Sequence, residues 1–288
     1  AFSYKRKNEN DTYYGITLIS DNINIPSWKK CSVFLKNTTN VVLEYGESKN
    51  GDLFLKKNLI YVYNKYSNSM NYITGDGGFD FSIDFNKQEQ SCYKLRFSQI
   101  MYAIIMQKKN GIFILKIFDM FRYQTIELLF LLSNFYEYMY IYKPHTSRIA
   151  NSEKYIICKN YKCNNNELLY KLIENYEFIL ENSEYISKLF NFTIPKLFIN
   201  KIEETNIIYG QQQIENINTT LNLIKEIQNI NQYNDNSNNI HDNININHNI
   251  NMQYYNIYNN IDNSIYSLNK IDLDFDNSKN HFNTNTSK

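Results

Sequence analysis

Residues 111–119 read GIFILKIFD and contain the strongest strand pattern in the chain. From 111 to 117 the run is apolar except for Lys116. A short, continuously apolar run is typical of a strand that is buried on both faces of a parallel sheet. Such a sheet needs helices on its faces, so this stretch predicts a layered α/β fold.

The segments around this strand alternate between strand-like and helix-like patterns. Helical lengths, with apolar residues at intervals of three and four, occur in 87–108 and 122–134. The other predicted strands are 13–19, 40–45, 71–74, 138–142 and 155–159. The alternation predicts one α/β domain over 1–163 with a mostly parallel sheet.

The sequence changes character after residue 163. Residues 164–230 predict a helical extension with helices at 167–190 and 211–230, which Pro195 separates. The second helix carries an apolar stripe, for which packing on its own domain is the usual explanation and a partner helix the alternative. The stripe consists of Ile214, Ile217, Leu221, Ile224 and Ile227. From Asn231 roughly a third of the residues are Asn, which predicts a disordered tail over 231–288.

Charge is distributed unevenly along the chain. The net charge is +1, but 1–163 holds 22 Lys and Arg against 14 Asp and Glu, whereas 164–288 holds 8 against 15. A basic first half suits a polyanionic partner, because neutralised phosphates release counterions. Solvated surface lysines are the alternative interpretation.

Several functional classes are disfavoured. The four cysteines (Cys31, Cys92, Cys158, Cys163) do not form a disulfide framework, and the four histidines show no metal-ligand spacing. The first residues are too polar for a secretory signal, and no apolar run approaches the roughly 20 residues of a membrane span. We expect an intracellular protein without a metal site or membrane segment; nucleus, cytoplasm and viral factory stay open.

Three charged residues lie at the ends of predicted strands. Asp76 follows the strand 71–74 within the string GDGG, Lys116 lies in the central strand, and Glu153 lies two residues before the start of the strand 155–159. Ligands of open α/β sheets bind outside the carboxyl ends of the strands. Taken singly, each residue has an ordinary explanation: a simple turn, a snorkelling lysine and a surface carboxylate. If all three reach one face of the sheet, mutual pairing would allow their burial.

Four strings together resemble the FtsJ-like ribose 2′-O-methyltransferases, in particular the branch that methylates the first transcribed nucleotide of capped mRNA in eukaryotes and large DNA viruses. The strings are DGGF (76–79), QE (88–89), LKIFD (115–119) and KPHTSRIANSEKY (143–155). The resemblance extends from residue 1 to about 162 and implies a Rossmann-like methyltransferase fold. It also implies S-adenosylmethionine as cofactor and RNA, in particular capped mRNA, as substrate.

The resemblance also implies roles for individual residues. The family's Lys-Asp-Lys-Glu tetrad matches Asp76, Lys116 and Glu153 in its last three members, while its first Lys and first strand would precede residue 1. The cofactor would contact Phe2 and Ser3, the tail of a glycine-rich motif, together with Asp52, Leu53 and Asp76. RNA would contact the remaining matched positions, which are Asn86, Lys87, Gln88 and Asn151.

Two alternatives stay open at this point. In the reaction, Lys116 would contact the attacking 2′-oxygen, either as a base or as an ammonium that orients the lone pair. An unperturbed Lys has a pKa of about 10.4, so a neutral Lys116 near pH 7.4 costs about 4 kcal/mol. For the protein as a whole, the alternative to an enzyme is a catalytically inactive methyltransferase-fold remnant that binds RNA.

Overall fold

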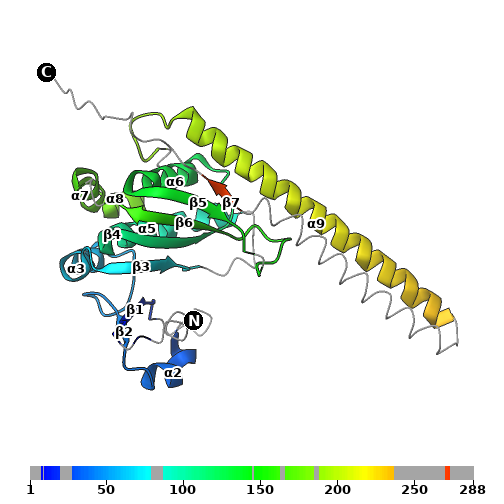
Figure 1. Ribbon diagram of the computed structural model, residues 1–288, viewed down its shortest axis with the longest axis horizontal. Helices are drawn as coiled ribbons and strands as arrows, with labels where there is room; N and C mark the ends of the chain where they lie inside the picture. The colour runs from blue at the N-terminus through cyan, green and yellow to red at the C-terminus, as the bar shows by residue number, and fades with distance from the viewer. Residues whose placement is uncertain are drawn as a thin grey trace.

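The computed structural model describes Asn8 and residues 10–19, 28–78, 87–144, 146–162, 166–184, 188–236 and 270–272. Its main feature is a five-stranded sheet with the order β3-β4-β6-β5-β7 (Figure 1). The strands are β3 (Met70–Gly75), β4 (Gln107–Ile117), β5 (Tyr136–Tyr142), β6 (Lys154–Tyr161) and β7 (Lys270–Asp272).

The directions of these strands determine where the site can form. β3 and β4 are parallel, and β6 lies antiparallel between β4 and β5. β3, β4 and β5 therefore share one direction, which confirms the predicted methyltransferase fold with a mostly parallel sheet, and the antiparallel β6 and β7 make the sheet mixed. The amino end of β6 consequently lies at the same edge as the carboxyl ends of the other three strands.

Two long helices cover this sheet and supply most of its core. α5 (Tyr93–Met106) packs on β3 and β4, and α6 (Tyr123–Phe135) packs on β5 and β6. The predicted helix 87–108 is interrupted at Cys92, where the short α4 (Gln88–Ser91) ends. α5 is buried over most of its circumference because α3 (Lys56–Tyr66) and α6 flank it.

A second, smaller sheet contains the first two strands of the structure. β1 (Tyr13–Ile16) and β2 (Val41–Glu44) pair in parallel, and η1 (Trp28–Cys31) and α2 (Ser32–Lys36) lie between them in the chain. Both strands were expected. Among the described strands, however, neither is hydrogen-bonded to the main sheet.

The helical extension is present, but its boundaries differ from the prediction. Residues 167–190 contain two helices, α7 (Asn166–Glu174) and α8 (Tyr176–Glu181), with a break at Asn175. The last helix, α9 (Lys196–Asn236), begins directly after Pro195 and not at 211. Proline is tolerated there because an amide N–H at a helix start lacks an intrahelical partner.

The extension does not have a core of its own. Tyr176, Phe198, Ile202 and Tyr209 belong to the same buried cluster as the sheet residues, so the expected boundary at 163 does not separate two cores. Residues expected in the disordered tail include the end of α9 and β7, which pairs with β5. The rest of 231–288 lies outside the described residues.

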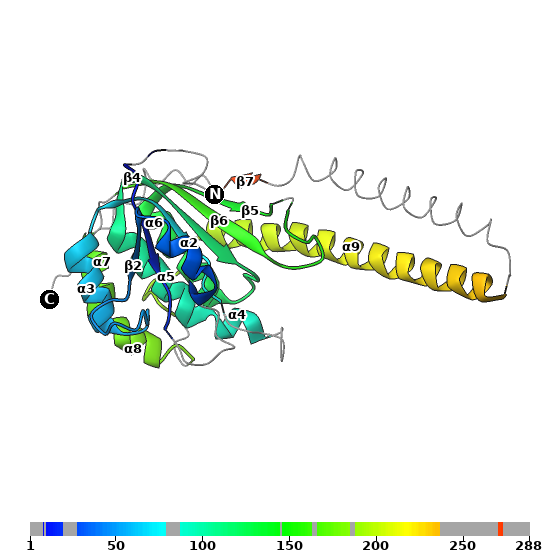
Figure 2. The same cartoon turned by 90° about the horizontal axis from the view of Figure 1, so that it is seen from below.

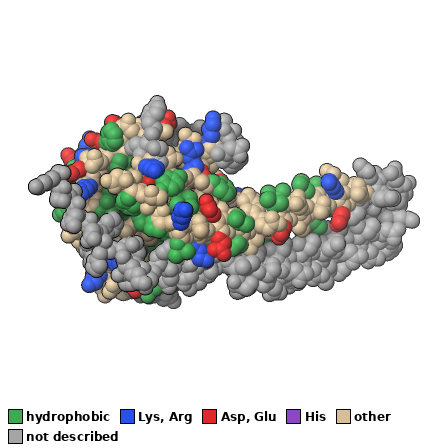
Figure 3. All heavy atoms as spheres, turned by 90° about the horizontal axis from the view of Figure 1, so that it is seen from above, with side chains coloured by type: hydrophobic (Ala, Val, Ile, Leu, Met, Phe, Trp, Pro, Cys, Tyr) green, Lys and Arg blue, Asp and Glu red, His purple; other side chains and the backbone are tan. Residues whose placement is uncertain are grey.

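The second half of α9 extends away from the sheet (Figures 1 and 2). The expected stripe does not pack on the described domain, since Ile214, Ile217, Leu221 and Ile224 are all exposed. Hydrophobic side chains are visible along this part of the helix in Figure 3. None of the described helices is both long and apolar enough to cross a membrane.

Candidate active site

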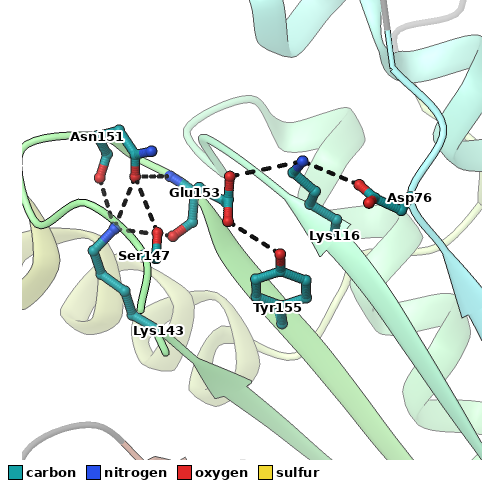
Figure 4. A network of polar contacts seen from close by, with 7 residues as sticks. All are labelled: Asp76, Lys116, Lys143, Ser147, Asn151, Glu153 and Tyr155. Atoms are coloured by element: carbon teal, nitrogen blue, oxygen red, sulfur yellow. Dashed lines mark hydrogen bonds and ion pairs between the residues drawn. The ribbon is translucent and has the colours of Figure 1, made fainter. Parts of the chain in front are cut away.

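Lys116 lies between two carboxylates at the edge of the main sheet (Figure 4). Its Nζ is 3.0 Å from Asp76 Oδ1 and 3.6 Å from Glu153 Oε2. The Lys116 and Glu153 side chains are 25% and 21% exposed, and Asp76 is 66% exposed. The structure thus brings together the three residues that the sequence placed at separate strand ends.

The alternation of β4 explains how a lysine occupies an apolar strand. Leu115 and Ile117 point into the core, so Lys116 points to the opposite, partly open face. Burial lowers the pKa of Lys116, but the hydrogen bond to Asp76 and the charges of Asp76 and Glu153 outweigh it. The net pKa is raised, and the ammonium stays charged at neutral pH.

The β4–β6 register places Glu153 beside Lys116. Tyr155 is the cross-strand partner of Lys116, and Glu153 lies two residues before it, just outside β6. The Tyr155 hydroxyl donates a hydrogen bond of 3.0 Å to Glu153 Oε1, while Oε2 faces the ammonium. Burial and this hydrogen bond raise the pKa of Tyr155, which keeps its hydroxyl protonated as the donor.

The buried Lys143 holds the connection between β5 and β6 through hydrogen bonds to two of its residues, Asn151 and Glu153. Its ammonium donates to Asn151 O at 2.7 Å, Asn151 Oδ1 at 3.1 Å and Glu153 O at 3.0 Å. Asn151 Oδ1 also accepts from the Glu153 amide and the Ser147 hydroxyl. Burial, with the nearby charge of Lys154, lowers the pKa of Lys143 to about 8. We refer to residues 143–153 as the carboxylate loop.

The expected adenosine positions lie in a turn after β2. Asp52 Oδ1 accepts from the Phe54 amide at 2.9 Å, and Asp52 Oδ2 accepts no hydrogen bond from the described residues. The turn requires Gly51, whose φ is +69° and where a Cβ would meet Thr17 O at 1.9 Å. Asp52 and Leu53 line a shallow hollow together with Tyr102.

The groups of this turn have the chemistry that the adenosine part of S-adenosylmethionine would need, but the hollow itself is too tight to hold a water molecule. Leu53 supplies an apolar surface, and the second Asp52 oxygen can accept from an amino or hydroxyl group. The Tyr102 hydroxyl is buried without a hydrogen-bond partner, which is unusual because buried polar groups are normally satisfied. Phe2 and Ser3, the other expected cofactor contacts, lie outside the described residues.

The expected RNA contacts are dispersed. Lys87 is exposed and lines a cavity of about 310 Å³ together with Lys94 and Arg122. Gln88 is only 7% exposed, so its side chain is not on the surface, and its RNA contact stays a prediction. The side-chain oxygen of Asn151 accepts a hydrogen bond from Lys143 within the carboxylate loop, and Asn86 lies outside the described residues.

Two functional positions had not been singled out from the sequence. Lys143 opens the KPHTSR string, but only the structure shows that its ammonium holds Asn151 and Glu153. Tyr155 closes the same string, and its role depends on the β4–β6 register. Among the described residues, no group of three or more His, Cys, Asp or Glu side chains is arranged to hold a metal ion.

Comparison with known proteins identifies the domain. The model of the FtsJ-like methyltransferase family matches residues 4–161, which is more than half of the chain. The match ends at the last strand residue of β6, so α7, α8 and α9 lie outside it.

Curated relatives share up to about three quarters of the chain. A cap-specific mRNA (nucleoside-2′-O-)-methyltransferase of Autographa californica nuclear polyhedrosis virus is 33% identical over 214 residues, which are 74% of this chain and 68% of that protein. The cap-specific mRNA (nucleoside-2′-O-)-methyltransferase 2 of Danio rerio is 33% identical over 184 residues, and that of Mus musculus 28% identical over 189. The chain spans 24% of the length of each of these two animal proteins.

Proposed function

The chain belongs to the FtsJ-like methyltransferase family, and we propose that it transfers a methyl group from S-adenosylmethionine to a ribose 2′-hydroxyl of RNA. We further propose that the acceptor is the first transcribed nucleotide of capped mRNA. The names of the relatives support capped mRNA as the substrate, and they do not specify which nucleotide is methylated. The observation that carries the proposal is the position of Lys116 between Asp76 and Glu153.

The Lys116 ammonium, held by two carboxylates, can still donate a hydrogen bond to a substrate oxygen. An ammonium has three N–H donors, and two carboxylates on two of its sides leave one direction for a further acceptor. A ribose 2′-oxygen in that direction would have its lone pair oriented for in-line attack. Orientation of this kind contributes more to the rate as the oxygen develops charge in the transition state.

The charge state of Lys116 distinguishes between the two roles considered for it. Its pKa is raised, which favours the charged form of Lys116 and so supports the orienting role over that of the base. It orients the oxygen, and the hydroxyl proton leaves as the new C–O bond forms. Glu153 Oε2, 3.6 Å from the ammonium, is a nearby acceptor for that proton.

The cofactor, when bound, supplies a methyl group activated on a positively charged sulfur. Asp52 and Leu53 would contact its adenosine part from the turn after β2, where Asp52 Oδ1 is held by the Phe54 amide. The lysines and the arginine of the cavity beside α4 would contact RNA phosphates. The excess of Lys and Arg in residues 1–163 supports the same kind of partner.

The test uses the full-length protein with capped RNA, the same RNA lacking one 2′-oxygen, and the same RNA without its cap. We expect methyl transfer to capped RNA, none to the same RNA with a 2′-deoxy first nucleotide, and little to uncapped RNA. Nuclease digestion then locates the methyl group. Equal labelling of the 2′-deoxy RNA would contradict this acceptor, and RNA binding without any transfer would support the inactive remnant instead.

A further inference from the structure

α9 lies outside the part of the chain that matches the family model, yet its first half is fixed to the catalytic domain. Phe198, Ile202, Thr205 and Tyr209 are buried at intervals of four and three residues, and α9 contacts α6. The Asn206 amide also donates to Met120 O at 2.8 Å, in the segment between β4 and α6. α9 is therefore attached next to the strand that carries Lys116.

One face of α9 contacts the carboxylate loop at two points and the residue directly after it at a third. Tyr209 contacts the first residue of the loop and the first residue of β6: the Lys143 backbone N–H donates to the Tyr209 hydroxyl, and the Lys154 ammonium lies over the Tyr209 ring, 5.5 Å from its centroid. Gln213, one helical turn further, donates from Nε2 to Ala150 O at 3.0 Å in the middle of the loop. Residues at i and i+4 share a helix face, so both side chains meet the same loop.

We propose that Tyr209 and Gln213 are positioning residues for Glu153. This inference rests on the proposed function, because it assigns α9 a part in the geometry of that reaction. The described residues of the carboxylate loop form no helix or strand. The conformation of the loop is restricted by Lys143, which belongs to it, and by the contacts with α9.

The two α9 contacts restrict the backbone on either side of Glu153. If the backbone at Glu153 can sample other positions, its carboxylate spends less time beside Lys116, and the rate of methyl transfer falls. The buried ammonium of Lys154 donates to Ser152 O at 2.7 Å, next to Glu153, and the Tyr209 ring supports that ammonium. Gln213 fixes Ala150, next to Asn151, whose Oδ1 accepts from the Glu153 amide. Both contacts from α9 thus reach Glu153 through a neighbouring loop residue.

The experiment compares two glutamines of the same helix. Gln213→Met keeps the length of the side chain but removes the donor to Ala150 O, and Gln213→Lys restores a donor. Gln211→Met is the matched control, because Gln211 is exposed and donates only to Glu215 of α9 itself. The measurements are single-turnover methyl transfer at saturating RNA and cofactor, both dissociation constants, and hydrogen exchange of the loop amides.

We expect Gln213→Met to slow single-turnover transfer by about two- to tenfold, the range of one net hydrogen bond. The dissociation constants should stay unchanged, the amides of residues 151–153 should exchange faster, and Gln213→Lys should recover most of the rate. If Gln213→Met behaves as Gln211→Met in both rate and exchange, the positioning role is wrong and the proposed function stands. If the unaltered protein transfers no methyl group, the proposed function is wrong and the positioning role falls with it.

Discussion

Lys116 and Tyr155 lie directly opposite each other in the antiparallel ladder of β4 and β6. Side chains of cross-strand partners lie on the same face of a sheet, so Lys116, Tyr155 and the preceding Glu153 meet on one side. A register slip of one residue would turn Lys116 to the other face and away from both carboxylates. The geometry of the site thus depends on strand pairing as much as on the identity of its residues.

Substitutions at Glu153 and Tyr155 should show how much the Glu153 charge and the Tyr155–Glu153 hydrogen bond each contribute to the rate of transfer. Glu153→Gln keeps an oxygen for the Tyr155 hydroxyl but removes the charge beside Lys116, and we expect single-turnover transfer to fall about ten- to hundredfold. Tyr155→Phe removes only the neutral hydrogen bond and should cost about two- to tenfold. A larger loss in Tyr155→Phe than in Glu153→Gln would contradict the assigned roles.

Asp52 should determine cofactor affinity and not the rate of transfer. Asp52→Asn keeps an oxygen for the Phe54 amide but replaces the second carboxylate oxygen, and calorimetry should show about tenfold or more weaker binding of S-adenosylmethionine. Glu47→Gln, an exposed carboxylate in the same turn region, serves as the control. Equal affinities of the two variants would remove Asp52 from the cofactor site.

Lys87 should contribute to RNA affinity through phosphate contact. Lys87→Ala is expected to weaken RNA binding and to reduce the slope of log K against log salt by about one. Lys108→Ala removes another exposed lysine, near the start of β4 and remote from the carboxyl edge, and should leave the slope unchanged. The same slope in both variants would show that the cavity beside α4 does not contact RNA.

Lys143 should make stability depend on pH in the alkaline range. Its folded-state pKa of about 8 lies below the usual value of 10.5, so between about pH 8 and 10 the unfolded chain binds more protons. The free energy of unfolding should therefore rise with pH in this window, by up to about 1.4 kcal/mol per pH unit for one such lysine. Lys154, with a pKa of about 8, adds to the same rise.

Urea unfolding of Lys143→Met between pH 8 and 10 tests this expectation. Without Lys143 one of the two titrations is lost, and the pKa of Lys154 should also move up, so the rise should flatten. Lys108→Met, at an exposed position, should keep the slope of the unaltered protein. An unchanged slope in Lys143→Met would mean that its burial does not perturb its protonation.

Much of the site could be predicted because its residues lie next to strong local patterns. Lys116 interrupts the apolar run of β4, and Asp76 and Glu153 each lie two residues from a predicted strand. The sheet order could not be derived from periodicity, because pairing partners such as β4 and β6 are separated by α6 and β5. Whether β1 and β2 join the main sheet also depends on contacts between residues far apart in the sequence, so local patterns could not predict that they form a sheet of their own.

The helical extension shows the limits of reading apolar stripes. The exposed stripe from Ile214 onward predicted only the second half of α9, although the buried residues from Phe198 to Tyr209 have the same helical spacing. α3 was not predicted, although Leu59, Val62 and Tyr66 form its buried face. The contact between Gln213 and Ala150 joins residues 63 positions apart, and no local pattern signals it.

The most direct test of the central claim is single-turnover methyl transfer by Lys116→Ala with capped RNA. We expect a loss of about a hundredfold or more, while the dissociation constants for RNA and cofactor stay within about twofold. Lys116→Arg should recover little, because a planar guanidinium cannot occupy the position of the compact ammonium between Asp76 and Glu153. A near-normal single-turnover rate in Lys116→Ala would contradict the catalytic role of this site.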